Sequence, residues 1–459
     1  MASQPSAPPA GHLADEIAGS PPYDRVRAWL VTALIVAFMV VNFADKAVLG
    51  LAAVPIMDEL HISHGTYGLI SSSFFLLFSL SGLVVGFVSS RVSSRTLLFV
   101  MTLTWAVAQL PVLVVAAVPT LVAGRVLLGA AEGPAASMSM HALYKWFPPH
   151  RRGLPSALQI SGAALGTLVS APVLTWLITD HGWRSAYAAL AAVSAVWALV
   201  WWHVGRDGPF DDARATPAGK RGPDAAPAAT VRLPYRRLLL TGTVLGSISS
   251  AFGASWALSL SQAWVPSYLR TELGMTPGAA ASTISAIATF SLVLLLTVSR
   301  LMDVLKARGV SSRWSSGAAQ GIAVCAAGCA MAAFPFVEAD VPQRLLLGLA
   351  FGTGAVAVPL HYMTVAEVVP AAQRGALFGI VAGAGTLPGL VAPSLAGRLI
   401  DAAGTTAAGY RTAFLLTAAV MLLTGLFALA RIRPERDAAR LGLPARAGAA
   451  LDARAGRRP

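Results

Sequence analysis

Long apolar stretches, separated by short polar turns, run along most of the chain. A helix needs about 20 apolar residues to cross the hydrocarbon core of a bilayer, and twelve stretches reach that length. In the first half, the predicted spans are residues 28–54, 67–89, 96–118, 121–144, 154–178 and 185–204. In the second half, they are residues 238–269, 279–302, 316–337, 344–368, 376–400 and 411–431. The pattern predicts an all-α membrane protein with 12 transmembrane helices in two pseudo-symmetric six-helix bundles.

Polar segments divide this pattern into five parts. We expect a cytoplasmic N-terminal tail (1–27), a first bundle (28–205), a cytoplasmic central linker (206–237), a second bundle (238–432) and a basic cytoplasmic tail (433–459). An internal repeat supports two bundles, because the pattern Pro-x-x-x-Arg-Gly follows the fourth predicted helix at 148–153 and the tenth at 370–375. Parallel repeats of six helices are typical of secondary transporters that rock one bundle against the other.

The composition agrees with a bilayer environment. The chain is 56% hydrophobic and 12% charged, with a mean hydropathy of +0.66, whereas soluble proteins carry roughly a quarter charged residues. The net charge of +13 does not indicate nucleic-acid binding, because most basic residues lie in short loops and at the tail. Neither a P-loop, a nucleophile elbow nor a metal-ligand cluster appears, and Cys325 and Cys329 lack metal-site spacing. We therefore expect no enzyme activity, no cofactor and no metal.

Lys and Arg are concentrated in the loops on one side of the predicted bundle. On that side lie Arg91, Arg95, Lys145, Arg151, Arg152, Lys306, Arg308, Arg313 and Arg374. The opposite side carries fewer basic residues, Arg184, Arg270, Arg344 and Arg411, and the acidic residues Asp58, Glu59, Glu338 and Asp340. Cytoplasmic loops carry the excess of Lys and Arg. The asymmetry predicts a multi-pass protein of the inner (plasma) membrane with both termini in the cytoplasm.

Three motifs carry a family resemblance. The loop at 86–95 resembles the Gly-x-x-x-Asp-Arg-x-Gly-Arg-Arg signature of the major facilitator superfamily, although Ser90 stands where the family has Asp. The first helix reads Asn-Phe-Ala-Asp-Lys at 42–46, and the fourth reads Arg-Val-Leu-Leu-Gly-Ala-Ala-Glu-Gly-Pro at 125–134. Both are similar to motifs of the anion:cation symporter family, which takes up organic anions with cations, usually protons.

The resemblance implies a major facilitator fold and a secondary active transporter. It implies proton-coupled symport of a small organic anion, such as a sugar acid or an aromatic carboxylate, by alternating access. The expected partners are that anion, protons and the lipid bilayer, and the expected unit is a functional monomer. The alternative is a proton-coupled antiporter that exports a drug or metabolite. Residues 171–176 interrupt the glycine-rich stretch typical of such efflux pumps, which disfavours this alternative.

Four charged residues fall inside predicted spans: Asp45, Lys46, Arg125 and Glu132. Each costs at least about 2.5–3.5 kcal/mol at mid-bilayer on insertion scales, so each needs a partner or a water-filled cavity. Arg125 and Glu132 are seven residues apart, which places them on one helix face. We predict that Lys46 and Arg125 bind substrate and that Asp45 and Glu132 couple protons. Protonating a carboxylate leaves a buried cation unpaired, and this cation attracts the carboxylate of a substrate.

A structural alternative remains open for these four residues. They can form two ion pairs that tie the first and fourth predicted helices together, with Arg125 as an anchor. Four further candidates for substrate binding are Phe78, Gln159, His361 and Tyr362, each of which can instead be a packing residue. Candidates for a cytoplasmic gate are Arg91, Arg95, Asp303, Arg308 and Glu367, although the basic ones also satisfy the positive-inside rule alone. Ser90 or Ser93 can cap the third helix instead of forming a gate contact.

Overall fold

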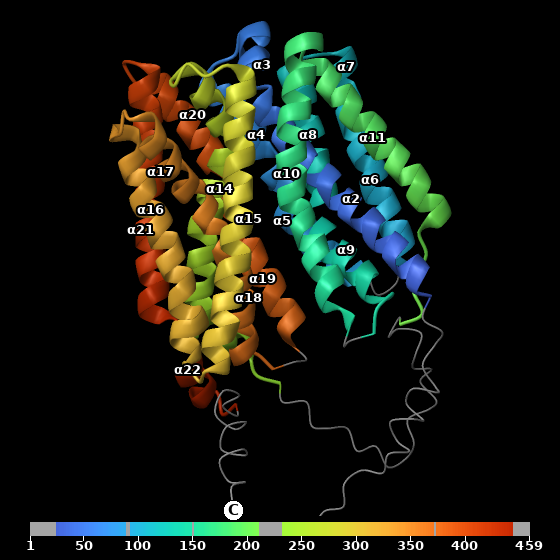
Figure 1. Cartoon of the computed structure of the whole chain (residues 1–459), viewed down its shortest axis with the longest axis vertical. Helices are drawn as coiled ribbons and strands as arrows, with labels where there is room; N and C mark the ends of the chain where they lie inside the picture. The colour runs from blue at the N-terminus through green and yellow to red at the C-terminus, as the bar shows by residue number, and fades with distance from the viewer. Residues whose placement is uncertain (1–23, 89–91, 149–150, 211–231, 371–372, 444–459) are drawn as a thin grey trace, which may run out of the picture.

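The computed structural model describes residues 24–88, 92–148, 151–210, 232–370 and 373–443. Helices from the two halves of the chain form two groups that stand side by side (Figure 1). The N-terminal group consists of α2 (Arg25–Leu51), α3 (Ala53–Leu60), α4 (His64–Ser73), α5 (Phe75–Val88), α6 (Ser94–Gln109), α7 (Pro111–Val114), α8 (Val118–Glu132), α9 (Ala135–Tyr144), α10 (Gly153–His181) and α11 (Trp183–Val204).

The C-terminal group is built in the same way from long helices and short breaks. It consists of α13 (Tyr235–Leu239), α14 (Gly242–Thr271), α15 (Pro277–Ala307), η2 (Arg313–Ala318), α16 (Ala319–Ala333), η3 (Phe334–Phe336), α17 (Asp340–Gly352), η4 (Thr353–Val356), α18 (Ala357–Val368), α19 (Arg374–Thr386), η6 (Leu387–Leu390), α20 (Ala392–Ala402), α21 (Thr406–Arg431) and α22 (Pro434–Arg440). We call the end that carries α3 and α7 the α3 end, and the opposite end the α22 end (Figure 1).

Within the described residues, nine helical segments are long and apolar enough to cross a membrane, and they overlap nine of the predicted spans, with ends that differ by up to a few residues. The other three predictions, 67–89, 121–144 and 344–368, fall on successive shorter helices. In one of them, α8 ends at Glu132 and Gly133-Pro134 follows; proline lacks the N–H that would continue the helical hydrogen bonds. The total of twelve spans therefore stays a prediction.

Short polar side chains begin several of these helices. Asp24, Ser63, Ser93, Thr241 and Thr405 each accept a hydrogen bond from a backbone N–H in the first turn of the helix that follows. Such caps satisfy N–H groups that have no partner inside the helix. The prediction that Ser90 or Ser93 caps the third predicted helix is thus confirmed for Ser93, whereas Ser90 lies outside the described residues.

The two loops of the internal repeat adopt one local structure. Arg152 Nε donates to the carbonyl of Phe147 at 2.9 Å. Arg374 Nε donates to the carbonyl of Val369 at 3.2 Å. In both loops, the guanidinium thus binds the carbonyl five residues before it. The motif that repeats in the sequence therefore also repeats a hydrogen bond in the structure.

The described residues of the predicted linker and tail pack against the helices. Trp146 Nε1 donates to the carbonyl of Arg206 at 3.0 Å. The side-chain amide of Gln373 exchanges two hydrogen bonds with the backbone of Leu233, at 2.9 and 2.8 Å. The first residues after 433 form α22, where Asp437 accepts hydrogen bonds from the backbone and side chain of Thr243. Both described ends of the chain lie toward the α22 end (Figure 1).

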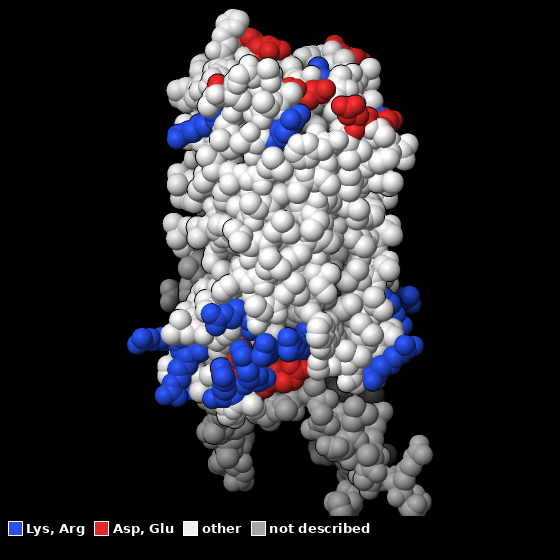
Figure 2. Space-filling model, turned by 90° about the vertical axis from the view of Figure 1, so that its left-hand side faces the viewer, with Lys and Arg blue, Asp and Glu red and all other residues white. Residues whose placement is uncertain are grey.

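Charged side chains are distributed unequally along the long axis. On the face shown in Figure 2, Lys and Arg gather at the α22 end, Asp and Glu are prominent at the α3 end, and a nearly uncharged band lies between them. An uncharged band flanked by charged rims suits a protein whose middle faces hydrocarbon.

A buried core at the α3 end contains side chains from both groups of helices. Tyr67 of α4 donates its hydroxyl hydrogen to the carbonyl of Leu49 at 2.9 Å and lies 3.3 Å from that of Ala263 in the other group. Gly50 lies so close to the backbone of Gln262 that no Cβ would fit there. The two groups are therefore in tight contact at this end.

Candidate functional site

Four charged side chains from two helices of the N-terminal group, three of them buried, form the candidate site. Asp45 and Lys46 lie in α2, and Arg125 and Glu132 lie in α8. Asp45, Arg125 and Glu132 are buried, and the Lys46 side chain is 11% exposed. Asp45 interacts electrostatically with the other three, and Glu132 with both cations. The structure thus brings all four predicted residues together.

Among the four charged residues, Lys46 makes the most varied contacts. Its ammonium lies 3.2 Å from Glu132 Oε2 and donates to Asn42 Oδ1 at 2.6 Å. The ring centroids of Phe43 and Phe78 lie 4.5 and 5.5 Å from it. Positive charge is attracted to aromatic faces, so both rings favour the ammonium at this position. Phe78, a predicted substrate-binding residue, therefore lies beside Lys46.

The Asp45 carboxylate accepts a hydrogen bond from a neutral side chain. Gln109 Nε2 of α6 donates to Asp45 Oδ1 at 2.8 Å, whereas Arg125 points at the backbone carbonyl of Asp45, 3.4 Å away. The Arg125 guanidinium also lies over the ring of Phe74, 4.7 Å from its centroid. Among the described residues, no ion pair joins the Asp45 carboxylate to Arg125. Of the two ion pairs in the structural alternative, the structure contains the one between Lys46 and Glu132.

Two residues of this site were not among the predicted site residues. Asn42 belongs to the motif at 42–46, in which the charges of Asp45 and Lys46 are the stronger signal. Gln109 had a detectable signal, because it is an amide within an otherwise apolar predicted span at 96–118. Both are buried. A buried amide needs hydrogen-bond partners, and each of these amides finds a charged one.

The remaining predicted substrate-binding residues lie apart from the four charges. Gln159 Nε2 donates to Ser139 Oγ at 2.9 Å and lies 3.3 Å from the carbonyl of Ala136, so it joins α10 to α9. His361 is buried, and its ring lies 4.6 Å from that of Tyr362 in the C-terminal group. In the part of the chain that is described, no hydrogen bond, ion pair or ring contact links these three residues to the charges.

The predicted gate residues are only partly described. Arg91 and the side chain of Asp303 lie outside the described residues. Arg95 donates to the carbonyl of Trp202 and stacks on its ring at 4.6 Å, so these contacts stay within the N-terminal group. Arg308 is exposed just beyond α15, and Glu367 is half-buried near the end of α18. A gate between the two groups therefore stays a prediction.

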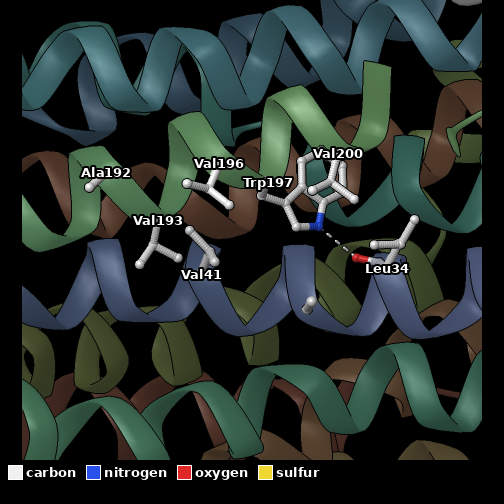
Figure 3. A pocket seen from close by; sticks show the side chains of 8 residues that line it. Leu34, Val41, Ala192, Val193, Val196, Trp197 and Val200 are labelled. Carbon is white, nitrogen blue, oxygen red and sulfur yellow. Dashed lines mark hydrogen bonds between the residues drawn. The ribbon is translucent and has the colours of Figure 1, made fainter. Parts of the chain in front are cut away.

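An apolar groove of about 350 Å³ runs between α2 and α11 (Figure 3). It is lined by Leu34, Ala37, Val41, Ala192, Val193, Val196, Trp197 and Val200. The one hydrogen bond drawn in Figure 3 runs from Trp197 Nε1 to the carbonyl of Leu34, at 2.9 Å. Val196 is 60% exposed, so the groove opens outward. Its lining includes none of the predicted site residues, and it belongs to the apolar outer surface.

Long apolar helices in two groups, charged rims and a cluster of charged side chains inside the N-terminal group define a multi-pass membrane transporter. The chain belongs to the Major Facilitator Superfamily, whose family model matches residues 33–337. The predicted superfamily and the major facilitator fold are confirmed, and the number of twelve spans stays a prediction. Because members of this superfamily are transporters, the prediction that the chain is not an enzyme is confirmed as well.

Several relatives of the chain are named as transporters of organic anions. The chain is 25% identical to the hexuronate transporter of Bacillus subtilis, over 86% of this chain and 92% of that protein. It is 26% identical to the D-galactonate transporter of Escherichia coli, over 82% and 90%. A further relative, at 28% identity over 51% of this chain and 55% of that protein, is a probable sulfoacetate transporter of Cupriavidus necator.

Solved structures share the fold. A bacterial homologue of the human lysosomal transporter Spinster, inward-facing and unoccupied, superposes with a TM-score of 0.71 at 15% identity, over 90% of this chain and 99% of that one. A D-xylose-proton symporter superposes with a TM-score of 0.71 at 15% identity, over 89% and 98%. At such identities the likeness concerns the fold alone.

Proposed function

We propose that the protein is a proton-coupled symporter that takes up a small organic anion, such as a sugar acid or an aromatic carboxylate. The hexuronate and D-galactonate transporters among its relatives support this class of substrate. The observation that carries the proposal is the Lys46–Glu132 ion pair, in which the cation is 11% exposed and the carboxylate is 0% exposed. A cation that still reaches solvent, paired with a carboxylate that does not, is suited to exchange its partner for an anionic substrate.

The coupling follows from charge balance. While Glu132 is ionised, it neutralises Lys46, and an incoming carboxylate must compete with it. When Glu132 takes a proton, Lys46 keeps Asn42 and the two phenyl rings but loses its anionic partner. An unpaired cation in this setting is costly, so a substrate carboxylate binds in its place. Proton binding and anion binding then favour each other, and by linkage the effect is mutual.

Asp45 is the second coupling group in this proposal. Its carboxylate is fully buried, and its described hydrogen bond comes from the neutral amide of Gln109. Arg125 holds the backbone of Asp45 rather than its carboxylate, so it fixes α2 against α8 and leaves the carboxyl group able to change its protonation state.

The proposed orientation places the α22 end in the cytoplasm of a cell bounded by its inner membrane. The excess of basic side chains at that end supports this orientation. The tight contact between the two groups at the α3 end then faces outward. In this proposal, the conformation is the one that loads or releases substrate on the cytoplasmic side, and the protein works as a monomer with Arg95, Arg308 and Glu367 near its cytoplasmic gate.

The test is uptake into proteoliposomes that contain the purified protein. An imposed pH gradient, acidic outside, should drive accumulation of labelled D-galactonate, D-glucuronate or benzoate. Glu132→Gln should abolish the accumulation but should retain exchange at equal pH, which needs no net proton movement. Asp340→Asn, which removes an exposed carboxylate paired with Arg344, is the matched control and should behave like the wild type.

Lys46 tests the charge of the substrate. Lys46→Ala should lose binding of the anion, and Lys46→Arg should retain part of it because the charge survives. A folded Lys46→Ala protein that binds the anion with unchanged affinity would contradict the proposal. Export of a neutral or cationic compound in exchange for protons would instead establish the antiporter alternative.

A further inference from the structure

A carboxylate of the C-terminal group caps a helix of the N-terminal group at the α3 end. Asp401 lies at the end of α20, and α4 begins at His64. Asp401 Oδ1 accepts the backbone N–H of His64 at 3.0 Å, and Oδ2 accepts that of Gly65 at 2.7 Å. The ring Nδ1 of His64 lies 2.9 Å from Oδ1 and donates to it.

This cap completes the first turn of α4. The first N–H groups of a helix have no partner within the helix. Ser63 satisfies the N–H of Thr66 from the same chain segment, at 3.2 Å. The two preceding N–H groups, those of His64 and Gly65, are satisfied across the boundary by Asp401. A negative charge at a helix N-terminus also interacts favourably with the helix dipole.

The backbones of α4 and α20 approach each other closely just below this cap. A Cβ on Gly68 would clash with the carbonyl of Pro393, and a Cβ on Gly397 would clash with the carbonyl of His64. Ser72 Oγ accepts the backbone N–H of Ser394 at 3.1 Å. This contact belongs to the junction that closes the α3 end, and it must come apart if the two groups separate there.

We propose that Asp401 is the latch of the α3-end gate. In a transporter that alternates between two open faces, opening at this end moves α4 away from α20. The Asp401 cap is then broken, and water replaces the carboxylate as the acceptor of the two N–H groups. Because water compensates for most of the loss, the latch biases the equilibrium toward the closed end without locking it.

Gly65 provides a way to weaken the latch without removing a charge. A Cβ at this position would lie 2.9 Å from Asp401 Oδ2, which is closer than real Cβ atoms come to other heavy atoms. Gly65→Ala therefore pushes the carboxylate away from the N-terminus of α4. The same substitution raises helix propensity, so it should not weaken α4 itself.

The test measures how readily the α3 end opens. Ser72, two turns along α4 from the latch, is buried and serves as a reporter when replaced by cysteine. The two native cysteines, Cys325 and Cys329, are replaced by serine in every variant. The readout is the rate at which a membrane-impermeant maleimide labels Ser72→Cys from the α3 side of oriented vesicles.

Asp401→Ala and Gly65→Ala should each raise the labelling rate roughly tenfold, the scale expected for a charge-assisted cap whose N–H groups water can satisfy. Asp401→Asn, which keeps an acceptor but no charge, should give a smaller increase. Glu59→Gln is the matched control, because Glu59 pairs with Arg184 at the same end but within one group. It should leave the rate unchanged.

Two results would overturn the latch. One is a wild-type labelling rate in folded Asp401→Ala or Gly65→Ala protein, with folding judged by size-exclusion profile and melting temperature. The other is an equal acceleration by Glu59→Gln, which would indicate general loosening of this end. If Asp401→Ala does not fold, Gly65→Ala decides the question alone, since it retains every charged group.

Discussion

The Lys46–Glu132 ion pair leads to a quantitative prediction, in which the two single substitutions destabilise the protein by unequal amounts. At 3.2 Å and an effective dielectric constant near 20, the gross attraction between the two charges is about 5 kcal/mol. Removing one partner of a buried pair typically costs about 3–5 kcal/mol, since an uncompensated charge remains. Replacing both partners by neutral groups is often close to neutral, because the desolvation of both charges is relieved as well.

Lys46→Ala and Glu132→Ala should differ in stability. Lys46→Ala leaves the Glu132 carboxylate with no exposed surface, whereas Glu132→Ala leaves an ammonium that is 11% exposed and keeps Asn42 and two rings. Lys46→Ala should therefore be the less stable single variant. The double variant should be more stable than Lys46→Ala, with a coupling free energy of about 2–4 kcal/mol.

Thermal unfolding of the detergent-solubilised protein, followed by the fluorescence of its 11 tryptophans, ranks the four proteins. A chemical-unfolding series would convert the ranking into free energies where unfolding is reversible. Additive losses, with a coupling below about 0.5 kcal/mol, would refute a strong pair and remove the physical basis for exchanging Glu132 against a substrate carboxylate. A more stable Lys46→Ala than Glu132→Ala would refute the asymmetry.

Two further predictions concern residues that hold charged partners. Gln109→Leu removes the amide that binds Asp45, so it should destabilise the protein by about 1–3 kcal/mol, lower its melting temperature and weaken pH-driven uptake. Unchanged uptake and an unchanged melting temperature would show that Gln109 does not position Asp45. At the α3 end, hydrogen bonds from Arg184 and Trp183 lower the pKa of Glu59 from 4.5 to about 2. The stability that Glu59 contributes is therefore fully present above about pH 4.5 and is lost as the pH falls toward 2. The side chains of Glu59 and Arg184 are both at least 40% exposed, so solvent screening limits the contribution of their ion pair to below about 1 kcal/mol. Melting curves should show a small deficit for Glu59→Gln at pH 6 that shrinks by pH 3, and a deficit independent of pH would contradict the assignment.

Hydrophobic patterning alone predicted the membrane class and the positions of nine long helices, because crossing a bilayer imposes a minimum length on each apolar run. It did not predict the breaks. The span expected at 67–89 divides at Phe74, and the span at 121–144 divides at Gly133-Pro134. Only the second break has an obvious local cause, since proline interrupts helical hydrogen bonds.

The sequence by itself determined which residues carry charge inside the membrane, because a charge in an apolar run is visible without any structure. It did not determine their partners. Asp45 and Lys46 are neighbours in the chain, yet successive helical residues point about 100° apart. One therefore meets Gln109 and the other meets Glu132, from different helices.

The contacts at the α3 end were even less predictable from the sequence. Asp401 and His64 are 337 residues apart, and neither stands in a motif. Their contact exists because α4 and α20 cross where glycines allow the backbones to touch. Local sequence determines the helices and the residues they carry, whereas contacts between distant helices depend on how whole faces pack, and only the tertiary structure decides that.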